Sequence, residues 1–226
     1  EAPWPGLVEV LKHVVGAVGD VDLEMAPPSP LGKCEVFGWS LAEARWRLRD
    51  GTLIGPGIGT WKLTPDEAAA RVAAALASGI RHVDTAAEYG TEGGVARAVR
   101  NSGIPRAEIF VNIKVAGESA DELRNVISDV RRSWGDGPID CLMLHRAPAA
   151  PEMLEQVWAV LEEEVRAGRA RYLGASNLTS AQLEALTFDG RLQSLWPAVV
   201  QLKCSVFHQG GYFSETSLAR LWAHLK

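Results

Sequence analysis

The chain has 226 residues, a formal net charge of −5 at pH 7, and hydrophobic and charged shares of 47% and 23%. This length is enough for one domain with a sizeable core, and the composition is that of an ordinary globular protein. The acidic balance gives no reason to expect a nucleic acid or an anionic membrane surface as a partner, so we exclude both function classes.

The first 45 residues are predicted to form an N-terminal extension to a domain that spans 46–226. Hydrophobic residues recur at helical spacing over 6–18, which predicts one amphipathic helix. This stretch contains charged residues and is too short to span a bilayer, so we expect no membrane span. A rigid, Pro-rich linker follows at 26–32.

A regular alternation of strands and helices begins near Trp46. Asp50-Gly51, placed between two short runs, predicts a hairpin. The strand candidates that follow are short and apolar on both sides, as expected for parallel strands covered by helices. They are residues 54–60, 81–85, 109–114, 140–145, 171–176 and 198–205.

Helix signals separate these strands. Thr64 is a predicted N-cap, Pro65 takes the first helical position and Glu67 completes a capping box, so a helix is expected over 64–79. We interpret the acidic run 162–164 as a solvated helix face. The remaining predicted helices are 92–102, 119–134, 151–167, 179–187 and 214–226.

Repeated strand–helix units build either an open doubly wound sheet or a closed (β/α)8 barrel. A doubly wound nucleotide fold would be expected to show a GxGxxG turn, and GPGIGTW at 55–61 does not fit that pattern. Polar residues instead stand at the carboxyl ends of the strands, which meet at one mouth in a barrel, so an α/β barrel is predicted. They are Thr60, Asp84, Lys114, His145, Ser176 with Asn177, and Gln201.

The cysteines indicate the compartment. Cys34, Cys141 and Cys204 are odd in number and widely spaced, which disfavours a disulfide framework and a zinc site. We therefore expect no metal and a reducing, intracellular compartment, cytoplasmic or organellar. Cys141 and Cys204 lie in apolar runs and are interpreted as small core residues. Because the chain begins at Glu1 rather than Met, we expect some processing or trimming.

Three of the strand-end residues, together with Tyr89 five residues after Asp84, suit the reduction of a carbonyl. Tyr89 near a buried Lys114 is expected to have a lowered pKa, because the ammonium favours the phenolate, and a tyrosine so tuned is a usable general acid. Asp84 would keep Lys114 charged and oriented. A neutral His145 could donate a hydrogen bond to a carbonyl oxygen as negative charge builds there. The hydride has to come from a cofactor.

Six segments carry a resemblance to a known family. VDTAAEYG, with its step of five residues from Asp84 to Tyr89, is a highly specific part of it. Over residues 47–208 the chain resembles the aldo-keto reductases. The segments are GIGTWKLTPDEA, ALASGIRHVDTAAEYGTEGGVARAV, SGIPRAEIFVNIK, IDCLMLHRAP, GRARYLGASN and PAVVQL.

The resemblance implies a role for each site residue and a small aldehyde or ketone as substrate. Tyr89 would be the proton donor, Lys114 would lower its pKa, Asp84 would pair with Lys114, and His145 would orient the carbonyl. NADPH is the implied hydride donor. The implied cofactor contacts are Gly59, Thr60, Trp61, Asp84, Ser176, Asn177 and Gln201, of which the last three would hold the nicotinamide amide.

The sequence also departs from the family pattern. Arg146 and Ala147 precede Pro148, where the family often has Trp and Pro directly after the His, so a charged side chain is expected at the pocket rim. Ile113 stands where Thr is usual. Nothing after Gln201 matches the family's last two strands, which carry the residues that clamp the cofactor. We therefore predict six of the eight strand–helix units. NADPH stays the implied cofactor, and without the clamp its binding could be weakened or absent.

Two functions stay open on this basis. The first is NADPH-dependent reduction of an aldehyde or ketone to an alcohol. The second is a catalytically inactive aldo-keto reductase-like subunit that serves as a structural or interaction component of a larger complex. An open barrel exposes the edges of its first and sixth strands, and residues 33–44, the helix over 6–18 or a protein partner would cover them. A third reading is that the native chain continues past Lys226.

Overall fold

A computed structural model describes residues 46–48, 50–188, 195 and 197–201. Several predictions therefore lie outside the described residues, among them the helices over 6–18 and 214–226, the linker at 26–32, the segment 33–44, and the environments of Cys34 and Cys204. The boundary between an extension and a barrel near residue 45 also stays a prediction.

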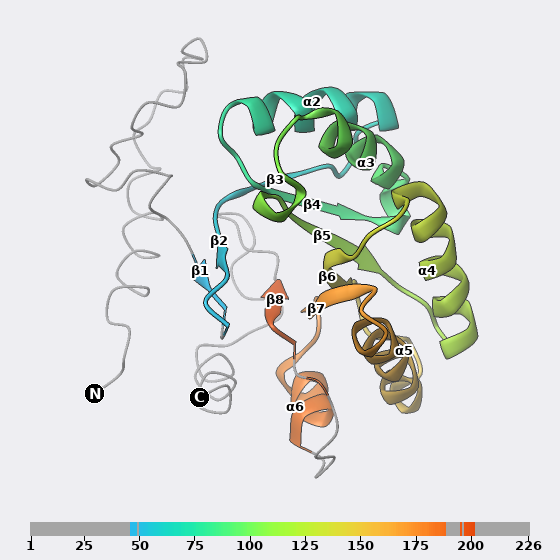
Figure 1. The fold of residues 1–226 in the computed structure, drawn as a ribbon. Coiled ribbons are helices and arrows are strands. Elements are labelled where there is room, and N and C mark those ends of the chain that lie inside the picture. The colour runs from blue at the N-terminus through green and yellow to red at the C-terminus, as the bar shows by residue number, and fades with distance from the viewer. Residues whose placement is uncertain (1–45, 49, 189–194, 196, 202–226) are drawn as a thin grey trace, which may run out of the picture.

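Within the described residues, a six-stranded parallel sheet forms the centre of the fold. Its strands pair in chain order, each with the next, so that the sheet curves as part of a barrel (Figure 1). This arrangement confirms the predicted α/β fold with six units of a (β/α)8 barrel. The strands are β3 (Gly57–Gly59), β4 (His82–Ala86), β5 (Phe110–Val115), β6 (Ile139–Leu144), β7 (Ala170–Ser176) and β8 (Val199–Gln201).

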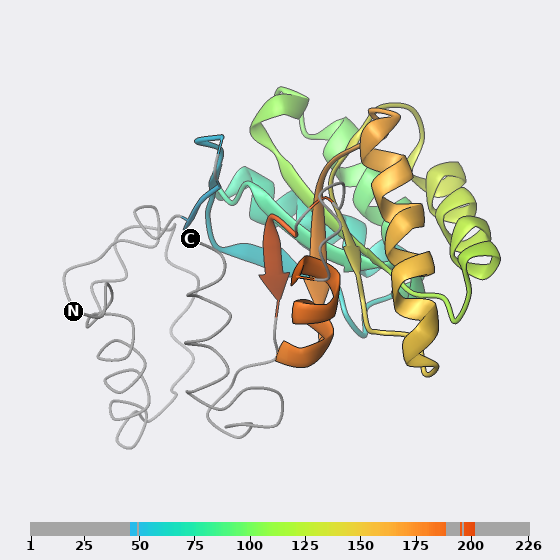
Figure 2. The ribbon, with the colours of Figure 1, turned by 90° about the horizontal axis from the view of Figure 1, so that it is seen from below.

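Helices connect the strands and form an arc along the outer face of the sheet (Figures 1 and 2). The predicted capping box of α2 is present, because Glu67 N donates to Thr64 Oγ1 and Thr64 N donates to Glu67 Oε2. The predicted helix over 151–167 begins as a short 3-10 helix, Pro151–Met153, before α5. The helices are α2 (Pro65–Ala77), α3 (Glu92–Asn101), α4 (Ala120–Trp134), α5 (Leu154–Arg166) and α6 (Ser180–Phe188).

Apolar side chains fill both faces of the central strands. Every residue of β5 and of β6 is buried, as the continuous apolar runs predict for strands covered on both sides. The larger core cluster lies between the sheet and the helices. A smaller cluster of Ile54, Phe110, Cys141 and Met143 fills the concave side, which confirms Cys141 as a core residue. Burial raises the pKa of the Cys141 thiol, so it is not a nucleophile in this structure.

The predicted strand over 54–60 is wrong as a single element. Ile54 belongs to β2 (Leu53–Ile54), which pairs antiparallel with β1 (Trp46–Arg47), while β3 starts only at Gly57. Gly55 and Pro56 separate the two strands, and proline cannot donate a ladder hydrogen bond. The predicted hairpin is confirmed. It lies near the amino-terminal end of β7, because Thr52 Oγ1 and the Tyr172 hydroxyl are 2.8 Å apart, and so at the end of the sheet opposite the carboxyl ends of the strands.

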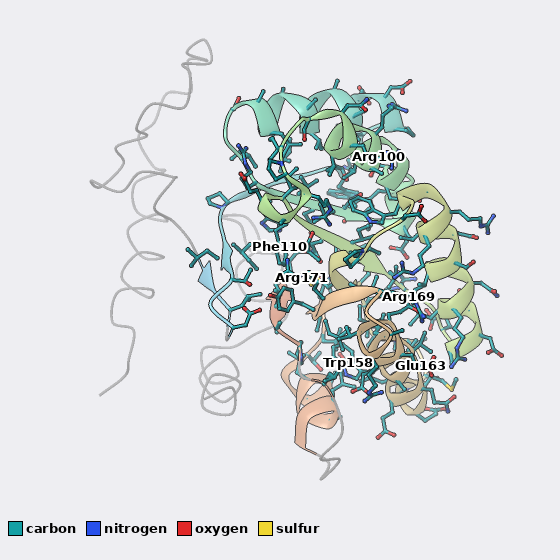
Figure 3. The ribbon with its side chains drawn as sticks, in the orientation of Figure 1. Arg100, Phe110, Trp158, Glu163, Arg169 and Arg171 are labelled. Carbon is teal, nitrogen blue, oxygen red and sulfur yellow. The ribbon has the colours of Figure 1, made fainter. Side chains whose placement is uncertain are left out.

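The acidic run on α5 is not the solvated face that its composition suggests. Glu162 accepts hydrogen bonds from Leu195 N (2.6 Å) and Arg166, and Glu164 accepts from Arg131 and Arg169. Both side chains are buried, and paired charges make that burial tolerable. Glu163 alone of the three is exposed, on the side of α5 that faces α4 (Figure 3). None of the described helices has the length and apolar character that crossing a bilayer requires.

Candidate active site

The carboxyl ends of neighbouring strands bring the four expected catalytic residues into one site. Asp84 and Lys114 lie on the adjacent strands β4 and β5, and His145 directly follows β6. Tyr89 ends a short 3-10 helix, Ala87–Tyr89, that follows β4. Parallel pairing in chain order is therefore what gathers residues that are up to 61 positions apart in the sequence, from Asp84 to His145.

An ion pair between a buried lysine and a partly buried aspartate lies at the base of this site. The ammonium of Lys114 contacts Asp84 Oδ2, and the two side chains are 3% and 18% exposed. The second carboxylate oxygen, Oδ1, accepts hydrogen bonds from Asn112 Nδ2 (2.6 Å) and Gln201 Nε2 (3.1 Å). Three donors from β5 and β8 thus hold one carboxylate, and their pairing offsets the cost of burying charge.

Tyr89 lies above this pair, next to His145. The centroid of the Tyr89 ring is 5.5 Å from Lys114 Nζ and 5.7 Å from the centroid of the His145 ring, which meets it edge-on at 80°. Burial first, and then the charges of Asp84 and Glu88, raise the pKa of Tyr89 above its ordinary value. The expected lowering of that pKa is therefore wrong for this arrangement. The physical reason is first the burial of Tyr89, which disfavours the charged phenolate, and then the pairing of the Lys114 ammonium with a carboxylate whose charge opposes it.

His145 is held through its backbone, and its burial favours the neutral imidazole. Its N–H donates to Val115 O (2.8 Å), and its carbonyl accepts from Asn177 Nδ2 (3.0 Å). Burial is the largest cause that lowers the pKa of His145, and it outweighs the opposing charge of Glu88. Glu88 Oε2 lies 2.9 Å from His145 Nδ1, although the two groups are not aligned for a hydrogen bond. A neutral imidazole in this position can orient a carbonyl, as the sequence reasoning expected.

Charged side chains form the rim of the site, as predicted from the presence of Arg146 directly after His145. Arg146 is half exposed, pairs with Glu88 and lies 3.9 Å from Glu118. Glu118 also accepts a hydrogen bond from Ala149 N (2.6 Å), so the loops after β4, β5 and β6 are joined at the mouth. The rim is therefore polar, with two carboxylates around one guanidinium.

The residues expected to hold the nicotinamide amide lie together at the ends of β7 and β8. Asn177 Nδ2 donates to Ser176 Oγ (3.1 Å), and Asn177 N donates to Gln201 O (3.3 Å). Asn177 has a φ of 55°, a left-handed conformation that asparagine tolerates better than most residues. The role of Ser176, Asn177 and Gln201 as cofactor contacts stays a prediction.

The expected contacts from the first strand are arranged differently. Thr60 is fully buried, and its hydroxyl lies 2.9 Å from the hydroxyls of both Thr85 and Thr91, which are themselves 2.9 Å apart. Its side chain therefore supports the strand ends rather than facing open space. Gly59 and Trp61 are exposed, and the Trp61 ring lies under Lys62 Nζ, 4.4 Å from the ring centroid.

Two residues of the site were missed by the sequence reasoning. Asn112 precedes Lys114 by two positions on a strand, so both side chains point to the same face, and a lone polar residue inside an apolar run was an available signal. Glu88 had no such signal, because an acidic residue next to Tyr89 is unremarkable in a sequence. Its importance comes from the loop after β6, which brings His145 and Arg146 to it.

The fold and the site together define a parallel α/β barrel whose strand ends hold Asp, Tyr, Lys and His as one constellation. Residues 53–218 match the family model described as the aldo/keto reductase family. The chain belongs to the aldo-keto reductase family, and this confirms the family that the sequence segments indicated.

Individual proteins agree with this assignment. The chain is 30% identical over 192 residues to an uncharacterized oxidoreductase of Schizosaccharomyces pombe, covering 74% of this chain and 57% of the relative. It is 32% identical over 163 residues to 2,5-diketo-D-gluconic acid reductase B of a Corynebacterium species, covering 69% and 56%. An aldo/keto reductase crystal structure from Brucella melitensis superposes with a TM-score of 0.65 at 29% identity, covering 71% of this chain and 62% of that one. The chain thus spans a little over half the length of these curated relatives.

Proposed function

We propose that this chain carries the catalytic half of an NADPH-dependent reductase that converts an aldehyde or ketone to an alcohol. Family membership and oxidoreductase relatives support carbonyl reduction in general. The observation that carries the proposal is the gathering of Tyr89, His145 and the buried Asp84–Lys114 pair at one mouth. A protonated tyrosine beside a neutral histidine is what proton delivery to a carbonyl oxygen needs.

The residues at the ends of β7 and β8 suit a carboxamide group. Asp84 can only accept hydrogen bonds, so Gln201 presents its Nε2 to Asp84, and within the described residues its Oε1 accepts no hydrogen bond. Asn177 likewise uses Nδ2 for bonds to His145 and Ser176, and its Oδ1 accepts none from the same residues. Ser176, Asn177 and Gln201 would hold the nicotinamide amide of NADPH, which when bound supplies the hydride.

The chain's own residues would do the proton chemistry. Tyr89 holds its proton at neutral pH, because burial and the nearby carboxylates raise its pKa. It would give that proton to the carbonyl oxygen as negative charge develops there, and the Lys114 ammonium would stabilise the tyrosinate that results. Neutral His145 would orient the carbonyl oxygen toward Tyr89. Because Arg146, Glu88 and Glu118 surround the mouth, the rim favours a small polar carbonyl compound over an apolar one.

NADPH binding and reductase activity test this function. Quenching of protein fluorescence measures NADPH affinity, and NADPH oxidation is followed with a panel of small polar aldehydes and ketones. Both are measured on the 226-residue chain and, where the native reading frame continues past Lys226, on the longer protein. We expect micromolar affinity and turnover. An absence of both in both proteins would refute the reductase and favour the inactive, structural alternative.

Tyr89→Phe identifies the acid. The phenyl ring keeps the packing against His145 but has no proton to give, so turnover should fall by at least about 100-fold with NADPH affinity nearly unchanged. Tyr172→Phe is the matched control, because Tyr172 bonds to the hairpin at the opposite end of the barrel. Turnover that survives in Tyr89→Phe would show that another group is the acid.

A further inference from the structure

Asn112 is an unusual residue for its place in the fold. It lies in the middle of β5, where every neighbour is buried, and the residue itself is 2% exposed. Asparagine is disfavoured in strands and rarely buried there, since its amide must find partners away from water. An apolar side chain of similar size would satisfy this position if packing were its only requirement.

The two ends of the Asn112 amide differ in their hydrogen bonding. Nδ2 donates to Asp84 Oδ1 at 2.6 Å and lies 3.7 Å from Met143 Sδ, whereas Oδ1 is buried and has no hydrogen-bond partner among the residues that the structure describes. Turning the amide over would place Oδ1 against the Asp84 carboxylate, acceptor against acceptor, so the orientation is determined. A buried, unpaired acceptor is destabilising. Asn112 therefore destabilises the fold through its oxygen, while its nitrogen holds Oδ1 of Asp84.

The other donor to that oxygen has a second role. Gln201 also donates to Asp84 Oδ1, yet it lies at the end of β8 among the residues that would hold a carboxamide. Asn112 is enclosed within the sheet and has no such second partner. It can therefore hold Oδ1 continuously, which keeps Oδ2 directed at Lys114 and keeps the ammonium beneath Tyr89.

We propose that Asn112 is a positioning residue that fixes the Asp84–Lys114 pair for proton delivery by Tyr89. Its catalytic consequence rests on the proposed reductase function, whereas its bond to Asp84 does not. Two experiments separate these parts, one on stability and one on turnover.

The first experiment needs no activity. Asn112→Leu is introduced into the native chain and into the double variant Asp84→Ala/Lys114→Met, which has neither charge. In the native chain the change removes a donor from a buried carboxylate. In the double variant it removes an amide that has already lost its acceptor. We expect the shift in unfolding midpoint caused by Asn112→Leu to be more favourable in the double variant by at least about 3 °C.

Cys141→Ala is the control for packing changes. Cys141 is fully buried and faces Asn112 in register on β6, but it makes no bond to Asp84. The shift in unfolding midpoint caused by Cys141→Ala should be the same in both backgrounds. Equal shifts for Asn112→Leu in the two backgrounds would overturn the proposal, because the side chain would then act only through packing. If the double variant does not fold, Lys114→Met alone serves as the second background. Asp84 has then already lost one of its three donors, so Asn112→Leu should lower the unfolding midpoint more than it does in the native chain, and equal shifts would again overturn the proposal.

The second experiment measures turnover. Asn112→Leu should lower kcat by about 10- to 100-fold, while KM for NADPH changes less than threefold. Asn112→Ser, which keeps a small donor, should recover part of kcat, whereas Cys141→Ala should keep it. An unchanged kcat in Asn112→Leu would overturn the catalytic part. An inactive native chain would instead refute the reductase proposal, and the stability experiment would still decide the role of Asn112.

Discussion

Removing either member of the Asp84–Lys114 pair should have unequal effects on stability. Lys114 is almost fully buried, and Asp84 is its only acceptor within the described residues. The carboxylate of Asp84 has two further donors, Asn112 and Gln201. Asp84→Ala therefore leaves a buried ammonium without a partner, whereas Lys114→Met leaves a carboxylate that is still hydrogen-bonded.

The expected magnitudes follow from this asymmetry. Removing one partner of a buried pair costs about 3–5 kcal/mol, and we expect Asp84→Ala near the upper end of that range. Lys114→Met should cost about 2 kcal/mol, because charge-assisted hydrogen bonds from two amides still compensate the carboxylate. The double variant should lose less free energy of unfolding than Asp84→Ala alone, since it contains no unpaired ammonium.

Urea unfolding at pH 7 and 25 °C measures these free energies for the native chain, the two single variants and the double variant. Asp66→Ala is the control, because Asp66 pairs with Arg97 on the surface and should contribute little. Two results would refute the inference that Asp84 keeps partners when Lys114 is removed, whereas Lys114 keeps none within the described residues when Asp84 is removed. One is that Lys114→Met costs as much free energy of unfolding as Asp84→Ala, and the other is that the double variant loses the sum of the two.

Two further predictions concern pH and packing. Because burial holds the pKa of His145 below its unfolded value, the chain should lose stability as pH falls from about 6.5 through that lowered pKa, and Glu88→Gln should lower the pKa further. An NMR titration of the imidazole checks this, and an upward shift would contradict it. Gly94→Ala should lower the free energy of unfolding by at least about 1–3 kcal/mol, because its Cβ would lie 2.0 Å from Pro65 O, whereas Gly93→Ala, with 3.9 Å to its nearest neighbour, should not. Equal unfolding midpoints for the two glycine variants would contradict this.

Much of the fold was predictable because its signals are local. The Thr64–Glu67 capping box and the Thr179–Gln182 pair both form as the sequence indicates, since each needs only three or four neighbouring residues. Apolar runs predicted the five strands from β4 to β8, because a strand covered on both faces has little freedom in composition. The specific order of residues around Asp84 and Tyr89 was enough to indicate the family.

Features that depend on partners distant in sequence were not predictable in this way. Glu162 and Glu164 are buried because arginines and a backbone N–H from other segments reach them. The pKa of Tyr89 is raised rather than lowered, because burial and two carboxylates outweigh an ammonium that is already paired. Whether a charge is exposed, and what it does to a neighbour's pKa, depends on distances that the order of residues does not contain.

The sequence by itself determined most of the described secondary-structure elements and the family, and it singled out the four residues that the structure brings together, because these are properties of short segments and their order. Tertiary structure alone decided that the carboxylate of Asp84 receives three donors and that Glu88 lies beside both His145 and Arg146. It also decided that the Asn112 amide is hydrogen-bonded through its nitrogen but, within the described part of the chain, not through its oxygen. Those facts arise from the register of parallel strands, which brings together side chains that the chain places far apart.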